Sequence, residues 1–124
     1  MEKKKILIVE DDSILQKALQ EFLDGEGFEI FSALDGEEGI KLGKEKKPDL
    51  VLLDIILPKK DGYEVLKELK SDENTKKIPV ILLTNLGSLN DVERAIEMGA
   101  NTYLIKADYK LEEVSSKIKE VLKM

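Results

Sequence analysis

Short apolar runs alternate with longer amphipathic segments along the whole chain, and this alternation limits the possible folds more than any other feature. The apolar runs are rich in Val, Ile and Leu, as is typical of strands buried on both faces. They occupy Ile6–Val9, Phe28–Phe31, Leu50–Leu53, Val80–Leu83 and Tyr103–Ile105. Each is followed by a segment of helical periodicity, so the chain predicts strand–helix units repeated in series.

The first helix is expected to begin at Ser13, which stands three residues before Gln16 in the spacing of a capping box, and to end at Gly25. The alternative N-cap is Asp12, which stands next to Ser13. Its apolar stripe includes Ile14, Leu19 and Leu23. The other helices are expected over Gly36–Lys46, after Asp61 as N-cap, over Leu89–Met98 with Ile96 facing inward, and from Leu111 to Leu122. Gly39 and Gly43 lie inside the second helix, where each costs about 1 kcal/mol relative to alanine, so we expect this helix to be weak.

Five strands alternating with five helices predict an α/β fold with a parallel sheet and right-handed crossovers. In a chain of 124 residues this favours a flavodoxin-like, doubly wound (βα)5 architecture with strand order 2-1-3-4-5. We expect residues 1–124 to form a single domain with no output domain. In such a fold the functional site lies beyond the carboxyl ends of the strands.

The chain has no histidine and no cysteine. Their absence excludes a Ser-His-Asp triad, zinc sites of the usual Cys/His kind, disulfides and a phosphohistidine on this chain. A net charge of −6 argues against binding to nucleic acid or to an anionic membrane. No signal peptide and no apolar run of membrane-spanning length is visible, so we expect a cytoplasmic protein.

Polar residues stand immediately after four of the apolar runs. Glu10 and Asp11 follow the first, Asp54 the third, Thr84 the fourth and Lys106 the fifth. Each alone reads more readily as a cap, a turn or a surface residue, but together they would converge at one edge of a parallel sheet. Carboxylates that close to one another need a cation between them, which Lys106 and a hard divalent metal such as Mg²⁺ can provide.

The combined motifs resemble the receiver domain of two-component response regulators, and the resemblance covers the whole chain. It is carried by Ile8-Val9-Glu10-Asp11-Asp12, Leu52-Leu53-Asp54-Ile55-Ile56-Leu57-Pro58 with Asp61-Gly62, Leu83-Thr84 and Ala100-Asn101-Thr102-Tyr103-Leu104-Ile105-Lys106. The chain looks like a stand-alone, chemotaxis-regulator-like receiver.

The resemblance implies a role for each matching residue. Asp54 matches the phosphoacceptor, while Glu10, Asp11, Asp54 and the backbone carbonyl of Ile56 match the ligands of Mg²⁺. Lys106 matches the lysine that pairs with the phosphoryl group. Thr84 matches the switch hydroxyl, and Tyr103 the aromatic residue whose rotamer follows it, although Tyr103 could equally be a half-buried strand tyrosine that never moves.

Four positions depart from the family pattern or tune the site. Ala107 stands where proline usually follows the lysine, so we expect a trans Lys106–Ala107 bond. Asn85 replaces a very small residue after Thr84 and could narrow access to Asp54. Ile56 and Leu86 are apolar at positions that influence how water reaches the phosphoryl group in this family, so we expect slow self-dephosphorylation.

The implied function is a phosphoacceptor module of a two-component system or phosphorelay. Its donor would be a sensor histidine kinase or a histidine phosphotransfer protein, and phosphorylation would change the surface of the fourth helix, fifth strand and fifth helix toward an unknown downstream protein. We expect a monomer or weak dimer that catalyses its own phosphorylation and turns over no external substrate.

The alternative is a receiver-like interaction module independent of phosphorylation. An aspartate-nucleophile phosphatase is disfavoured by Ile56, which stands where such hydrolases carry a second acid, and a flavin protein by the lack of a phosphate-binding loop.

Overall fold

The computed structural model describes residues 3–84, 89–106 and 110–124 and contains one five-stranded parallel sheet. Its strands are β1 (Lys5–Val9), β2 (Glu29–Ala33), β3 (Leu50–Asp54), β4 (Val80–Thr84) and β5 (Thr102–Ile105). The sheet order is β2-β1-β3-β4-β5, which confirms the predicted flavodoxin-like topology. The strands take up the predicted apolar runs with shifts of one or two residues at their ends.

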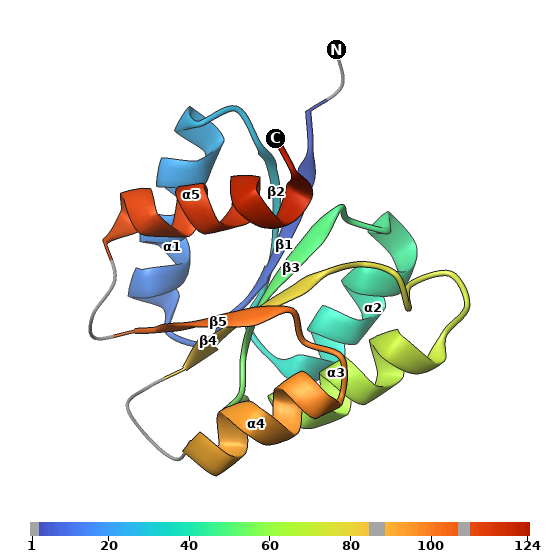
Figure 1. Ribbon diagram of the computed structural model, residues 1–124. Coiled ribbons are helices and arrows are strands. Elements are labelled where there is room, and N and C mark those ends of the chain that lie inside the picture. Colours follow the sequence, from blue (N-terminus) through green and yellow to red (C-terminus); the bar gives the residue numbers. More distant parts are fainter. Residues whose placement is uncertain (1–2, 85–88, 107–109) are drawn as a thin grey trace.

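Helices cover both faces of the sheet, as Figure 1 shows. They are α1 (Ser13–Gly25), α2 (Gly36–Lys46), α3 (Gly62–Ser71), α4 (Leu89–Glu97) and α5 (Leu111–Leu122). One buried cluster joins the strands to α1 and α5, through residues such as Leu23 and Ile118. The other joins them to α3 and α4, through residues such as Leu66 and Ala95, with α2 packed at its edge. Among the described residues, no helix is both long and apolar enough to cross a membrane.

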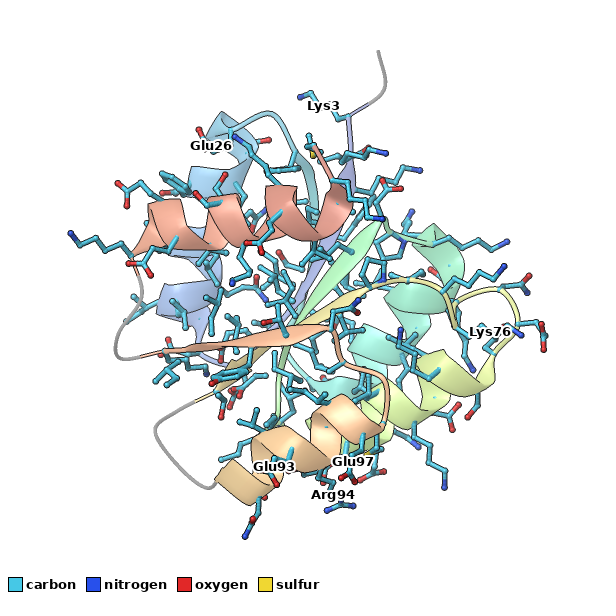
Figure 2. All side chains as sticks on the ribbon, in the orientation of Figure 1. Lys3, Glu26, Lys76, Glu93, Arg94 and Glu97 are labelled. Carbon is cyan, nitrogen blue, oxygen red and sulfur yellow. The ribbon has the colours of Figure 1, made fainter. Side chains whose placement is uncertain are left out.

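Helices α1 and α5 are also linked by polar contacts. Ser115 on α5 donates a hydrogen bond to Glu26 Oε1 at 2.9 Å, and Lys119 Nζ lies 3.6 Å from the same oxygen. Glu26 is the C-cap of α1, and Figure 2 shows it at the end of that helix beside α5. These contacts fix the two helices on one face relative to each other.

Helix α1 begins and ends where predicted, but its cap is the alternative, Asp12, and not the capping box. The N-cap is Asp12, whose carboxylate accepts hydrogen bonds from the backbone N–H groups of Ile14 and Leu15. The predicted capping box from Ser13 to Gln16 is therefore wrong. Ile14 is 82% exposed, because at about 100° per residue it lies on the opposite side of α1 from the buried residues Gln16 and Leu23. Ile96 was also expected to face inward, but it is 42% exposed on α4.

The two glycines inside α2 are sites of close packing. A Cβ atom at Gly39 would lie 2.8 Å from a methyl carbon of Val9, and one at Gly43 would lie 2.8 Å from a methyl carbon of Leu69. Both distances are shorter than van der Waals contact. The glycines thus lower the helix propensity of α2, as expected, but they let the helix approach β1 and α3 closely.

Gly62, the first residue of α3, closes the loop that follows Asp54. Its N–H donates to the carbonyl of Ile55 at 2.7 Å. A Cβ atom at this position would lie 2.4 Å from the carbonyl oxygen of Asp54 and 2.6 Å from Cα of Ile55. Only a residue without a side chain fits here unless the backbone beside Asp54 moves.

We therefore expect Gly62→Ala to lower the free energy of unfolding by about 3 kcal/mol, because backbone atoms rather than flexible side-chain ends must shift. Gly25→Ala is the matched control, since no other segment lies within 4 Å of its would-be Cβ, and it should leave stability unchanged or raise it by up to about 1 kcal/mol. Urea denaturation of both variants measures the difference. Equal midpoints for the two variants would show that the loop is looser than the structure indicates.

Candidate functional site

The strand register brings three charged residues to one edge and one face of the sheet. Ile8 is paired with Leu52, and Leu83 with Leu104. Ile8, Leu52 and Leu104 all belong to the cluster beneath α1 and α5. Glu10, Asp54 and Lys106 each follow one of these residues by two positions, so the alternation of side chains predicts the same face for all three.

Lys106 lies between the two buried carboxylates. Its Nζ is 2.6 Å from Glu10 Oε1 and 2.8 Å from Asp54 Oδ2. The Lys106 side chain is 15% exposed, and those of Glu10 and Asp54 are 0% and 7% exposed. Burial alone would lower the pKa of the Lys106 ammonium, but its contacts with Asp54 and Glu10 outweigh burial and raise that pKa above 10.5. Lys106 is therefore held in its charged form.

The pKa of Glu10 is also raised above its ordinary value of 4.5, mainly because burial disfavours the carboxylate. The lysine and the backbone N–H of Asp12 oppose that shift without cancelling it. The nearby negative charge of Asp54 adds to the rise in the pKa of Glu10, and the single cation Lys106 is shared between these two buried acids. The site as built has an unneutralised negative charge, which a divalent cation would compensate.

Three carboxylates form a group suited to a metal ion. Glu10, Asp11 and Asp54 each offer an oxygen, and these oxygens lie within 4.8 Å of one another. Asp11 is exposed, whereas the other two are buried. Within the described part of the chain, Glu10 Oε1 makes no hydrogen bond of regular geometry, and its close neighbour is the Lys106 ammonium. An all-oxygen set open to solvent on one side fits a hard cation such as Mg²⁺.

Backbone groups orient the remaining carboxylate oxygens. The N–H of Asp12 donates to Glu10 Oε2 at 3.0 Å, and the N–H of Ile56 donates to Asp54 Oδ1 at 3.3 Å. The Ile56 backbone therefore lies beside Asp54, as its expected role in metal binding requires. The Ile56 side chain points away from the core and is 74% exposed.

Thr84 and Tyr103 lie on the neighbouring strands β4 and β5. Thr84 is the last residue of β4 and is partly buried, and its carbonyl accepts a hydrogen bond from the N–H of Lys106 at 2.7 Å. Tyr103 is paired with Leu82 and is 38% exposed. Since Leu82 and Thr84 alternate to the same face, Tyr103 and Thr84 share that face. Whether they move together stays a prediction.

The structure thus places Glu10, Asp11, Asp54, Ile56 and Lys106 at one site, with Thr84 at its border. The positions Asn85, Leu86 and Ala107 lie outside the described residues. One buried polar residue beside the site, Gln16, was assigned to a cap in the sequence. Its spacing with Leu19 and Leu23 could have placed it on the inward face of α1 instead.

The chain is similar to known proteins over nearly its whole length. The sequence profile of the response regulator receiver domain matches residues 6–119. The DNA-binding dual master transcriptional regulator RpaA of Synechocystis is 36% identical over 119 residues, which is 96% of this chain and 49% of that protein. The alkaline phosphatase synthesis transcriptional regulatory protein PhoP of Bacillus subtilis is 37% identical over 120 residues, covering 97% of this chain and 49% of that one.

A solved structure with a bound magnesium ion shares the fold. The receiver domain of a sensor histidine kinase from Pseudomonas aeruginosa, determined with a magnesium ion coordinated in its active site cleft, superposes with a TM-score of 0.89 at 28% identity. The match covers 99% of this chain and 100% of that one. The chain spans about half the length of the curated relatives that it matches.

Proposed function

The chain belongs to the response regulator receiver domain family, the phosphoacceptor domains of two-component signalling, and we propose that it takes a phosphoryl group from a partner's phosphohistidine onto Asp54. The observation that carries the proposal is the shared contact of Lys106 with Asp54 and Glu10 at 2.8 and 2.6 Å, beside the exposed carboxylate of Asp11. The residue that would receive the phosphoryl group therefore lies among groups that can neutralise it.

In the transfer, a carboxylate oxygen of Asp54 forms a bond to phosphorus while the bond from phosphorus to the imidazole nitrogen breaks. The histidine nitrogen leaves with the electron pair of that bond and takes a proton from solvent. Asp54 is suited to this attack because a carboxylate is a competent nucleophile toward phosphoryl groups. Its Oδ1 is oriented by the N–H of Ile56, and the chain contains no histidine, so a phosphohistidine donor must come from a second protein.

Glu10, Asp11, Asp54 and the carbonyl of Ile56 would hold Mg²⁺, which when bound supplies positive charge to the phosphoryl oxygens. Lys106 would supply a second positive charge to the same oxygens, since its Nζ already contacts Asp54. Placing fixed charge where negative charge accumulates is the main catalytic device available to this site.

Phosphorylation of Asp54 would then change the conformation of the surface formed by α4, β5 and α5. A phosphoryl group replaces one carboxylate charge with a larger anion that carries new acceptor oxygens. Thr84 at the end of β4 can donate to one of them, and Tyr103 on the same face can follow. Thr84 and Tyr103 would thus have two conformations, and the charge at Asp54 would set the equilibrium between them.

The partners in this proposal are a sensor histidine kinase or a histidine phosphotransfer protein upstream and an unidentified protein downstream, in the cytoplasm. RpaA is named as DNA-binding and PhoP as a transcriptional regulator, and this chain matches about half of each. That this domain itself binds no nucleic acid stays a prediction. A phosphorylation-independent interaction module is the alternative, and nothing in the acidic site favours it.

The experiment that tests the proposal is incubation with acetyl phosphate and Mg²⁺, followed by intact mass spectrometry. We expect a gain of one phosphoryl group in the presence of Mg²⁺ and none when EDTA replaces it. A folded protein that gains no mass at any Mg²⁺ concentration would contradict the proposal. A phosphomonoester offered in the same buffer should not be turned over.

We also expect the phosphorylated protein to lose its phosphoryl group slowly. The Ile56 side chain is two residues past Asp54 and lacks any group that could orient a water molecule toward the phosphorus. Ile56→Asn supplies such a group and should shorten the phosphoryl lifetime several-fold. Ile14→Asn is the control, since Ile14 is as exposed but lies on α1. Lifetimes are read from the decay of the phosphorylated mass, and equal lifetimes for the two variants would refute this role for Ile56.

A further inference from the structure

Gln16 is a buried polar residue that the phosphoryl-transfer mechanism does not use. It lies on the inward face of α1 with Leu19 and Leu23 and is 4% exposed. A glutamine amide at such a position costs free energy unless its polar atoms are satisfied. Its Oε1 makes no hydrogen bond among the described residues, so the reason for its presence must lie in the contacts of its Nε2.

The Gln16 amide nitrogen faces three backbone carbonyls where β1 and β2 end. Its Nε2 lies 3.1 Å from the oxygen of Ile8, 3.3 Å from that of Glu10 and 3.0 Å from that of Ala33. The amide has two N–H groups, so three acceptors require that at least one of them be shared. The same Ala33 oxygen accepts the N–H of Glu10 at 3.0 Å.

The contact with Glu10 places Gln16 next to the proposed metal site. The carbonyl of Glu10 belongs to the peptide unit that joins Glu10 to Asp11, and this unit is planar. Fixing its oxygen fixes the orientation of the bonds that lead to both side chains. The Glu10 carboxylate is buried against Lys106, and the Asp11 carboxylate is exposed. The orientation of the peptide plane between these residues therefore sets how closely their carboxylate oxygens approach each other.

We propose that Gln16 is a positioning residue of the metal site, which sets Mg²⁺ affinity by holding the peptide plane between Glu10 and Asp11. This inference rests on the proposed function, because it requires that these carboxylates bind the ion. Gln16 touches neither the ion nor the phosphoryl group and acts through the backbone. Groups that orient metal ligands in this way commonly change affinity by about 10–100-fold when removed.

The test compares Gln16→Met with Thr75→Val by titration calorimetry with Mg²⁺ alone. Methionine keeps the length of glutamine and removes the donor. Thr75 is 1% exposed and donates to the carbonyl of Leu69 at 2.6 Å, far along the chain from the site, so Thr75→Val also deletes a buried hydrogen bond. We expect Gln16→Met to weaken Mg²⁺ binding about 10-fold and Thr75→Val to bind as the wild type does.

Equal Mg²⁺ affinity in the wild type and Gln16→Met would overturn the inference while leaving the proposed function intact. Loss of affinity in both variants to the same extent would also overturn it, since the effect would then follow stability alone. A wild-type protein that binds no Mg²⁺ would instead contradict the proposed function itself. The three results are therefore distinguishable.

A measurement on the wild type removes any dependence on the folding of Gln16→Met. The chain has two glutamines, Gln16 and Gln20, so its glutamine side-chain amide signals are few in an NMR spectrum. Gln20 is exposed and serves as the internal control. We expect the Gln16 amide protons to exchange slowly with solvent and to shift on addition of Mg²⁺, while those of Gln20 do neither. Similar behaviour of the two amides would overturn the proposal.

Discussion

Asp54→Asn should abolish covalent phosphorylation by acetyl phosphate, with no gain of phosphoryl mass even after prolonged incubation with Mg²⁺. The reason is chemical, since an amide cannot serve as the nucleophile toward phosphorus as a carboxylate can. The fold should survive the change. Asparagine keeps an oxygen that can accept from the N–H of Ile56, and it removes one of the two acids that share Lys106.

The matched control for this prediction is Asp61→Asn. Asp61 is the N-cap of α3, where its carboxylate accepts from the N–H of Glu64 at 3.0 Å. Asparagine caps helices about as well as aspartate, so this variant should remain folded and gain one phosphoryl group at the wild-type rate. Phosphorylation that persists in Asp54→Asn, or is lost equally in both variants, would place the acceptor elsewhere.

Lys106→Met should slow phosphorylation at saturating Mg²⁺ by about 100-fold, the usual consequence of removing one preorganised charge from a developing anion. It should also lower the free energy of unfolding by about 3 kcal/mol, because Glu10 is fully buried and loses its cation. Binding of Mg²⁺ should persist and grow tighter, since the three carboxylates remain and their positively charged neighbour is gone. The rate is measured from the time course of the intact mass.

Lys44→Met provides the comparison for this second prediction. Lys44 forms an ion pair with Glu68 at 3.3 Å, but its side chain is 40% exposed and lies on α2. Exposed pairs contribute little to stability, so Lys44→Met should match the wild type in rate and in unfolding. If Lys106→Met is phosphorylated as fast as Lys44→Met, the contact with Asp54 has no catalytic role.

The fold and the convergence of the charged residues could be predicted from the sequence because both depend on where strands end. A strand buried on two faces is marked by a continuous apolar run, and the residue after it is fixed by that run. The strand register then shows how the site residues are aligned across the sheet, which their spacing in the sequence does not show. Glu10 and Asp54 are level across β1 and β3, whereas Lys106 starts two residues farther along β5 and reaches back with its long side chain.

The errors occurred where tertiary contacts decide between two local patterns. Ser13 and Gln16 have the spacing of a capping box, yet Asp12 caps the helix and Gln16 turns inward to the carbonyls of the sheet. Ile14 falls at one margin of the apolar stripe of α1, on the opposite side of the helix from the buried residues Gln16 and Leu23. Periodicity describes a helix in isolation, so it cannot show which part of a broad apolar stripe the neighbouring layer covers.

The glycines illustrate the same limit from the opposite side. Helix propensity marks Gly39 and Gly43 as weak points, and only the structure shows Val9 and Leu69 packed against them. Likewise, nothing in the sequence indicates that Gly62 lies against the backbone of Asp54. A glycine in the sequence shows that a side chain is missing, but it does not show which distant segment packs against that position.

The most direct test of the central claim is to locate the phosphoryl group in the wild-type protein. An acyl phosphate is reduced by borohydride to an alcohol, which converts the modified aspartate to homoserine and marks its position for peptide mass spectrometry. After incubation with acetyl phosphate and Mg²⁺, we predict homoserine at position 54 and unmodified acids at Glu10, Asp11 and Asp12. Homoserine at another aspartate, or phosphoprotein that gives none at position 54, would contradict the assignment of Asp54 as the phosphoacceptor.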